Sequence, residues 1–331
     1  MFYYEVWVRS IRYKGSKPLT YSFPNKLATG QIVEVQLQKE TVLGVVSSTV
    51  LKPRFKVKDI TKVLELPPLP PEQIKLMEWI VEFYPSSVGE ASRLILPSKI
   101  PKKLVFPERG SSTLAHEIPK LTDDQEKVVS SITDNDTYLL HGRTGSGKTR
   151  IYIEIAREKI EDGRSSIILT PEISLTSQLY LNFQKQFGDQ VILMHSKQTD
   201  KERFQSWLYI LSSDRPVIVI GPRSALFSPI SNLGLIVVDE SHESSYKQDQ
   251  QPYYLTNRVA SYLNKISKSV LILGSATPSI SDYFLAKQKN KKILEMKKTA
   301  IDSSDKDTVV EIIDLKDKSN FTKSKHPWPP C

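Results

Sequence analysis

The sequence predicts an α/β fold in which a small β-rich domain precedes a lobe built on a parallel sheet. Two patterns indicate this order. Apolar and polar residues alternate within residues 1–65, and short apolar runs alternate with helical segments from residue 121 onward. The third observation is the length: at about 150 residues per domain, a chain of 331 residues fits two domains.

Residues 1–98 form the first predicted domain. The stretch 32–37 alternates apolar and polar residues, and 43–46 is a second β-rich run, so both are predicted strands. The proline-rich stretch 66–71 then forces an extended break. The helix predicted after this break has an apolar face, which core packing explains.

Residues 99–120 are rich in Pro, Gly, Ser and Lys, and form the predicted linker to a lobe at 121–300. The lobe contains six short apolar runs, at 138–140, 166–169, 191–193, 217–220, 235–238 and 270–273. Such runs are typical of strands buried on both faces, as in a parallel sheet covered by helices. For residues 301–331 we expect one strand and a disordered tail.

The chain is basic, with 46 Lys and Arg against 37 Asp and Glu. The first 120 residues hold 18 of these basic residues and only 11 acidic ones, which indicates a polyanion partner; solubility alone would also explain the excess. The single cysteine, Cys331, excludes an intrachain disulfide and a four-cysteine zinc site. No apolar run is long enough for a membrane span, so we expect a soluble cytoplasmic protein.

Residues 142–149 match the motif G-x-x-x-x-G-K-[ST] between a predicted strand and a predicted helix. Glycines let backbone N–H groups surround a phosphate, a lysine adds a cation, and a hydroxyl can ligate Mg²⁺. An ordinary glycine-rich turn is the alternative interpretation. The predicted nucleotide-binding residues of this loop are Gly142, Thr144, Gly145, Ser146, Gly147, Lys148 and Thr149.

Two carboxylates, Asp239 and Glu240, follow the apolar run 235–238. We expect Asp239 and Thr149 to hold Mg²⁺, and Glu240 to orient and deprotonate the attacking water. An acidic pair after a strand is often a solvated loop, but together with the glycine-rich motif it favours an NTPase. A third strand end carries small hydroxyl residues, Ser275-Ala276-Thr277, which can hydrogen-bond the catalytic acid and couple its state to other sites.

Asp239-Glu240-Ser241-His242 and the Ser275–Thr277 motif resemble superfamily-2 helicases. Within that superfamily the chain is similar to the PriA family, because 169–176, 194–196, 219–227 and 244–248 match that family's segments in order. The resemblance implies a RecA-like P-loop lobe, ATP and Mg²⁺ as cofactors, and 3′–5′ DNA helicase activity in replication restart. It also implies single-stranded and forked DNA, and other primosome or replisome proteins, as partners, and a DNA-binding N-terminal domain that holds a 3′ end.

The resemblance further implies roles for single residues. Gln125 would read adenine, although a helix-capping role after Thr122 is the alternative. His242 would couple DNA contact to catalysis, with Ser275, Ala276 and Thr277. The residues implied to contact DNA are Thr170, Arg223, Ser224, Tyr246, Lys247 and Lys58. For Arg223 a surface ion pair, and for Tyr246 simple packing, are the alternatives.

The chain also departs from the family pattern. Ser241 stands where the family has Glu, and Thr20 where it has an Asp that helps to hold the terminal nucleotide. Only about 20 residues lie where the family has a winged-helix domain, too few for a packed domain. A second lobe and its zinc insertion are not expected here, so we expect no zinc. The alternative function is a DNA- and ATP-binding module without autonomous unwinding.

Overall fold

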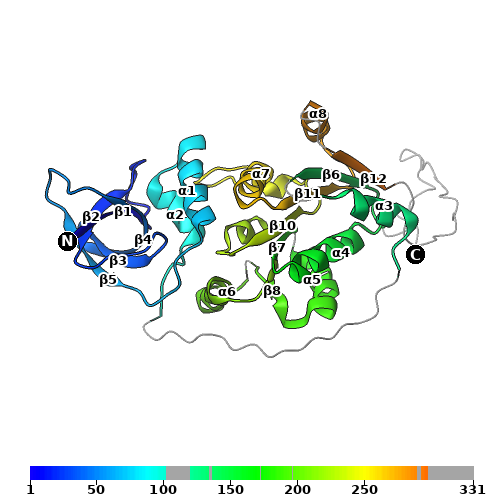
Figure 1. Ribbon diagram of the computed structural model, residues 1–331. Coiled ribbons are helices and arrows are strands. Elements are labelled where there is room, and N and C mark those ends of the chain that lie inside the picture. The colour runs from blue at the N-terminus through cyan, green and yellow to red at the C-terminus, as the bar shows by residue number, and fades with distance from the viewer. Residues whose placement is uncertain (102–119, 134–135, 172, 196, 289–291, 297–331) are drawn as a thin grey trace, which may run out of the picture. The chain divides into compact units, whose positions relative to one another are not determined.

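The computed structural model describes residues 1–101, 120–133, 136–171, 173–195, 197–288 and 292–296 (Figure 1). Its N-terminal part contains five strands and two helices: β1 (Phe2–Val8), β2 (Leu19–Phe23), β3 (Ile32–Leu37), β4 (Glu40–Val50), β5 (Lys58–Val63), α1 (Pro71–Phe83) and α2 (Val88–Ile95). The two predicted strands, at 32–37 and 43–46, correspond to β3 and to the middle of β4.

The five strands close into a barrel with the order β1-β2-β5-β3-β4. Closure follows from β1, which pairs antiparallel with both β2 and β4. The alternating residues of these strands point inward, so every strand contributes to one small core. Its buried residues are Tyr4, Val6, Val8, Tyr21, Val33, Val35, Val46 and Ile60.

Helix α2 begins at a capping box and packs closely against the loop after β1. The Ser87 hydroxyl accepts the N–H of Glu90, and the Glu90 carboxylate accepts the N–H of Ser87. One residue into the helix, a Cβ at Gly89 would lie 1.8 Å from the backbone oxygen of Ser10. Only glycine therefore allows α2 to approach this loop.

We expect Gly89→Ala to destabilise the protein by about 3 kcal/mol, because the colliding atom belongs to the backbone and cannot rotate away. Urea unfolding measures this loss. Gly15→Ala is the matched control. Its nearest neighbour is the end of the Tyr13 side chain, which can move, so its cost should stay below about 1 kcal/mol. Equal losses in the two variants would contradict this account of α2.

The second part is a seven-stranded sheet with helices on both faces. Its strands are β6 (Thr137–Gly142), β7 (Ser165–Leu169), β8 (Val191–Leu193), β9 (Ile218–Gly221), β10 (Leu233–Val238), β11 (Val270–Ser275) and β12 (Lys292–Met296). Its α-helices are α3 (Asp123–Ser131), α4 (Lys148–Glu161), α5 (Ile173–Phe187), α6 (Asp200–Ser212), α7 (Thr256–Ser267) and α8 (Ile280–Gln288). The 3₁₀ turns are η1 (Gly188–Gln190), η2 (Arg223–Phe227) and η3 (Ser244–Tyr246).

The strand order is β12-β6-β11-β10-β7-β9-β8, and every neighbouring pair is parallel. The predicted fold class, a lobe with a parallel sheet after a β-rich domain, is confirmed. All six apolar runs are strands of this sheet, while β12 was not predicted. Most of the predicted linker, and the strand and tail expected within 301–331, lie outside the described residues.

Alternate residues of the buried strands face two different layers. One face packs against α3, α4 and α5, with Ile168, Val237 and Ile272 among its strand residues. The other face packs against α6 and α7, with Ile167 and Val238 among its strand residues. Helices on both faces explain why these strands read as continuous apolar runs.

Helices α1 and α2 contact the helices that cover this second face. The Trp207 indole N–H of α6 donates to the backbone oxygen of Ile95 at 2.8 Å. The Gln73 amide of α1 donates to the backbone oxygen of Ser228 at 2.9 Å. Trp79 of α1 stacks on Tyr262 of α7, with ring centroids 4.4 Å apart. One apolar core therefore continues from the barrel side through α1 and α2 into the lobe.

Candidate nucleotide and nucleic-acid site

The motif residues meet at one edge of the parallel sheet. The glycine-rich loop follows β6, Thr170 follows β7, and Asp239 follows β10. Arg223 begins the turn after β9, and Ser275 ends β11. Because parallel strands place their carboxyl ends at the same edge, segments distant in sequence form a single site there.

The glycine-rich loop joins the end of β6 to the first residue of α4. Gly145 and Gly147 have φ angles of 77° and 87°, the left-handed region in which glycine is favoured. Gly147 is also the N-cap of α4, so the N-terminus of the helix lies directly at the end of the loop. Thr149 lies in that first turn. Backbone N–H groups at a helix N-terminus bind phosphate, as the motif predicts.

Lys148 lies at the centre of the site, with only 8% of its surface exposed. Its ammonium group donates to the backbone oxygen of Gly142 at 3.0 Å. It also forms an ion pair with Glu240, with 3.4 Å between the Lys148 Nζ and Glu240 Oε1 atoms. The lysine of the loop and the second acid of the pair are thus in direct contact.

Asp239 is held by a residue that the sequence reasoning missed. Tyr152 is a fully buried residue of α4, and its hydroxyl donates to Asp239 Oδ1 at 2.9 Å. Burial and the neighbouring Glu240 charge raise the pKa of Asp239, and burial together with the Asp239 charge raises that of Tyr152. No sequence motif indicates a role for this tyrosine. In the sequence it is one of several residues that form the apolar face of a helix.

Glu240 connects the loop lysine to the third strand-end motif. It has a φ of 45°, so its backbone turns sharply directly after Asp239. Its Oε2 atom accepts the N–H of Ala276 at 3.4 Å and lies 3.7 Å from Nδ1 of His242. The same His242 nitrogen is 2.8 Å from the Ser275 hydroxyl, which also accepts the N–H of Thr277 at 3.0 Å. Glu240 and His242 are therefore linked to Lys148 and to the Ser275–Thr277 motif by hydrogen bonds and ion-pair contacts.

Gln125 uses its amide within the protein. The amide oxygen accepts the N–H of Thr122 in a capping box, and its nitrogen lies 3.4 Å from the backbone oxygen of Gly147. The capping alternative therefore describes this side chain, and the second contact ties α3 to the glycine-rich loop. Adenine reading by Gln125 stays a prediction.

Two of the residues implied to contact DNA are covered. Thr170 is 1% exposed, and its buried hydroxyl has no hydrogen-bond partner among the described residues. Tyr246 is 4% exposed, and its hydroxyl donates to the backbone oxygen of Asp239 at 2.7 Å. Neither side chain has surface available for a direct DNA contact in this structure. Tyr246 instead supports the Asp239 backbone, which agrees with the packing alternative.

The other implied DNA contacts lie at or near the surface. The Arg223 guanidinium donates to the backbone oxygens of Ser245 and of Lys247, the second at 2.8 Å. It therefore joins the turn after β9 to the loop after the acid pair. Ser224 and Lys247 are exposed beside it. Lys58 is exposed on β5, where its ammonium donates to the backbone oxygen of Gln38.

Two family sequence models match separate parts of the chain. Residues 122–284 match the DEAD/DEAH box helicase family, and residues 10–97 match the 3′ DNA-binding domain of PriA. The two matched ranges fall on the sheet-bearing lobe and on the barrel with its two helices, respectively. No helix within the described ranges has the length and apolarity to cross a bilayer.

Relatives agree with these matches. The replication restart protein PriA of Helicobacter pylori (strain J99 / ATCC 700824) is 37% identical over 274 residues, which cover 82% of this chain and 43% of the relative. PriA of Chlamydia trachomatis serovar D is 41% identical over 62% of this chain and 28% of the relative. PriA of Bacillus subtilis (strain 168) is 40% identical over 54% of this chain and 23% of the relative.

The chain thus spans less than half the length of these relatives. Its barrel and helix pair match the DNA-binding domain of the family, and its parallel-sheet lobe matches the helicase domain. Over the region that it shares with these relatives, the chain belongs to the PriA family of replication restart proteins.

Proposed function

We propose that this chain supplies the first ATP-hydrolysing lobe and the DNA-end-binding domain of a 3′–5′ DNA helicase that restarts stalled replication. One observation supports it above the rest: Glu240 lies between Lys148 of the glycine-rich loop and the backbone of the Ser275–Thr277 motif. The group that would activate water thus contacts both the nucleotide loop and the third motif.

The residues present fit a Mg–ATP complex. The glycine-rich loop offers backbone N–H groups in the left-handed turns at Gly145 and Gly147, and Lys148 offers a cation. Thr149 and Asp239 would hold Mg²⁺, which when bound neutralises charge on the phosphates. The Tyr152 hydroxyl fixes one oxygen of the Asp239 carboxylate.

The chain's own residues would then act on the water. Phosphate oxygens would draw the Lys148 ammonium away from Glu240, because a phosphate carries more negative charge than a carboxylate. The released Glu240 carboxylate can accept a proton from water positioned in line with the terminal phosphate. His242 forms a hydrogen bond with Ser275 and precedes the loop that contains Ser244 and Lys247. A movement of Glu240 would therefore be transmitted through His242 to this loop.

DNA is the proposed macromolecular substrate, single-stranded and forked, with other primosome proteins as further partners. The matched 3′ DNA-binding domain and helicase domain of the relatives support this substrate. On the lobe, the exposed Ser224 and Lys247 would contact DNA beside the acid pair. Arg223, which precedes Ser224 in the chain, donates a hydrogen bond to the backbone oxygen of Lys247. Lys58 contributes a cation on the barrel.

Glu240→Gln tests the proposed water activation. In the native polypeptide that contains this sequence, we expect DNA-stimulated ATP hydrolysis to fall about 10²–10⁴-fold, because an amide cannot accept the proton. Binding of a fluorescent ATP analogue should persist. Glu243→Gln is the matched control, because Glu243 is half exposed and reaches His242 only at 4.0 Å. Hydrolysis at the wild-type rate in Glu240→Gln would exclude Glu240 as the base.

The same measurements separate the alternative function. A native polypeptide that binds both the ATP analogue and DNA, yet neither hydrolyses ATP nor separates a duplex, would be a DNA- and ATP-binding module without autonomous unwinding. DNA-stimulated hydrolysis that depends on Glu240 would exclude that alternative.

A further inference from the structure

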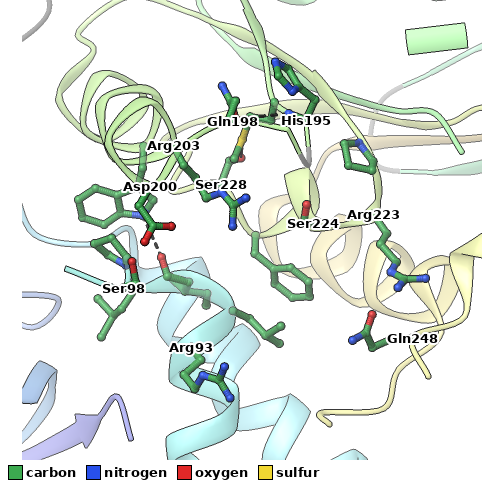
Figure 2. Close-up of a pocket in the computed structure, with 18 of the residues that line it drawn as sticks. Arg93, Ser98, His195, Gln198, Asp200, Arg203, Arg223, Ser224, Ser228 and Gln248 are labelled. Atoms are coloured by element: carbon green, nitrogen blue, oxygen red, sulfur yellow. Dashed lines mark hydrogen bonds between the residues drawn. The ribbon is translucent and has the colours of Figure 1, made fainter. Parts of the chain in front are cut away.

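A cavity of about 790 Å³ opens between helix α2, helix α6 and the turn η2 (Figure 2). It lies beside the acid-pair loop, because Ser245, Tyr246 and Gln248 also line it. A volume of this size accommodates a ligand larger than a single inorganic ion. The nucleotide loop contributes no residue to the lining, so this cavity is separate from the ATP site.

The charges that line the cavity are predominantly positive. Four arginines, Arg9, Arg93, Arg203 and Arg223, face one aspartate, Asp200. These arginines come from both parts of the protein, since Arg93 belongs to α2 whereas Arg203 belongs to α6. A concave surface with low-dielectric walls and one sign of charge concentrates anions.

Among the described residues, two of the four arginine side chains have a hydrogen-bond partner and two have none. Arg9 donates to the backbone oxygen of Leu96, and Arg223 donates to two backbone oxygens. Within the part of the chain that the structure describes, the Arg93 and Arg203 side chains form no hydrogen bond and no ion pair. Figure 2 shows the Arg203 side chain extending across the cavity toward Ser224.

The positive charges also act on one another. Burial lowers the pKa of the Arg9 guanidinium, the nearby Arg93 charge lowers it further, and Asp200 opposes the shift. Cations held this close without enough counter-charge indicate a site whose anion comes from outside the chain.

We propose that this cavity binds consecutive phosphates of one DNA strand, with Arg93 of α2 and Arg203 of α6 contacting the strand from opposite sides. The inference rests on the proposed function and adds Arg93 and Arg203 to the DNA contacts that the resemblance implies. A DNA strand fits because the cavity runs on to exposed Ser224 and to Pro171 at the end of β7. Guanidinium groups bind phosphate oxygens in a two-pronged geometry.

A strand bound here contacts both parts of the protein at once. Helices α2 and α6 are already joined through the Trp207–Ile95 hydrogen bond and the shared apolar core. DNA would therefore meet a preformed site and would not need to bring the two helices together. Preorganisation of this kind lowers the entropic cost of binding.

The test is binding of a fluorescein-labelled oligothymidylate to the full chain, measured by anisotropy over a range of salt concentrations. We expect Arg93→Ala and Arg203→Ala each to weaken binding about fivefold at low salt, as for an exposed ion pair. Each should also reduce the slope of log affinity against log salt by about 0.7, the value for one phosphate contact on a single strand. The double variant should lose both contacts.

Arg215→Ala is the matched control, because Arg215 is exposed in the same lobe but precedes β9, at the opposite edge of the sheet. Urea unfolding and binding of a fluorescent ATP analogue verify that each variant is folded. Wild-type DNA affinity and salt slope in both cavity variants would overturn the inference. Polyglutamate that binds with the same dependence on Arg93 and Arg203, and displaces the oligonucleotide, would assign the cavity to an acidic protein instead.

Failure of the underlying function gives a different result. If the wild-type chain binds no oligothymidylate at all, the proposed DNA substrate fails together with this site. If the wild-type chain binds DNA and only the arginine substitutions are without effect, the proposed function stands and this cavity is excluded from it.

Discussion

Lys148→Ala is expected to weaken nucleotide binding about 10- to 100-fold. A hydrogen bond between charged groups contributes about 1.5–3 kcal/mol, and this variant removes the side-chain cation of the glycine-rich loop. The loss should be largest for ATP and smaller for ADP, because the lysine of such a loop contacts the terminal phosphates. Titration with fluorescent ATP and ADP analogues measures both affinities.

The same variant should abolish DNA-stimulated ATP hydrolysis in the native polypeptide. Without the Lys148 ammonium, the negative charge that develops on the terminal phosphate loses its stabilising cation. Lys185→Ala is the matched control, since Lys185 is an exposed lysine on α5. Unchanged affinity for the ATP analogue in folded Lys148→Ala protein would refute the assignment of this loop as the nucleotide site.

Most strands of the parallel sheet could be predicted from the sequence. The strands β7, β9, β10 and β11 were predicted because two helical layers bury them, which produces continuous apolar runs. The edge strand β12 was missed, because Lys292–Met296 mixes exposed and buried residues and lacks such a run. Its strand conformation depends on pairing with β6, a partner that the local sequence does not reveal.

The barrel shows the same limit. Alternation predicted a β-rich domain, but closure depends on the pairing of β1 with β4, whose register shifts between Glu5 and Val6. A register shift of this kind follows from long-range packing and has no local signal. The helix α2 was missed for a related reason: it requires Gly89 to approach the Ser10 backbone, and a glycine in a short segment ordinarily disfavours a helix.

The candidate site was predictable where chemistry follows a motif. The glycine-rich loop and the Asp239–Glu240 pair require fixed residue types at fixed spacing. The contacts that support the site follow no such spacing and could not be predicted. Tyr152 and Asp239 are 87 residues apart in the sequence, and Trp207 and Ile95 are 112 residues apart. The burial of Tyr246 was likewise decided by tertiary packing, because an aromatic residue in a loop serves equally well as a core residue or as a stacking surface.

Gly274→Ala is expected to lower the free energy of unfolding strongly. Gly274 lies directly before the Ser275–Thr277 motif. A Cβ there would lie 1.8 Å from the Tyr152 hydroxyl and 3.5 Å from Asp239 Oδ1. Tyr152 is fully buried, and protein interiors are close-packed, so we expect Gly274→Ala to displace the ring from Asp239. We expect a loss of about 3 kcal/mol in unfolding free energy, which combines overpacking with a buried carboxylate deprived of its donor.

Gly163→Ala is the control for backbone effects, because Gly163 has a φ of 71° and open space around its missing Cβ. Its cost should be limited to the strain of the left-handed conformation, about 1–2 kcal/mol. Gly274 carries no such strain, so any excess in Gly274→Ala comes from the contact with Tyr152. Urea unfolding of both variants measures the difference.

Tyr152→Phe then separates the clash from the hydrogen bond. Alone, it should cost about 1–3 kcal/mol, since Asp239 keeps its burial but loses the hydroxyl. Combined with Gly274→Ala, it removes the colliding oxygen and leaves the ring carbon Cζ at 3.0 Å, so the double variant should be more stable than the sum of the two losses predicts. Strict additivity would mean that the two residues act independently. Less than additive losses would show that Gly274 exists to let the Tyr152 hydroxyl reach Asp239.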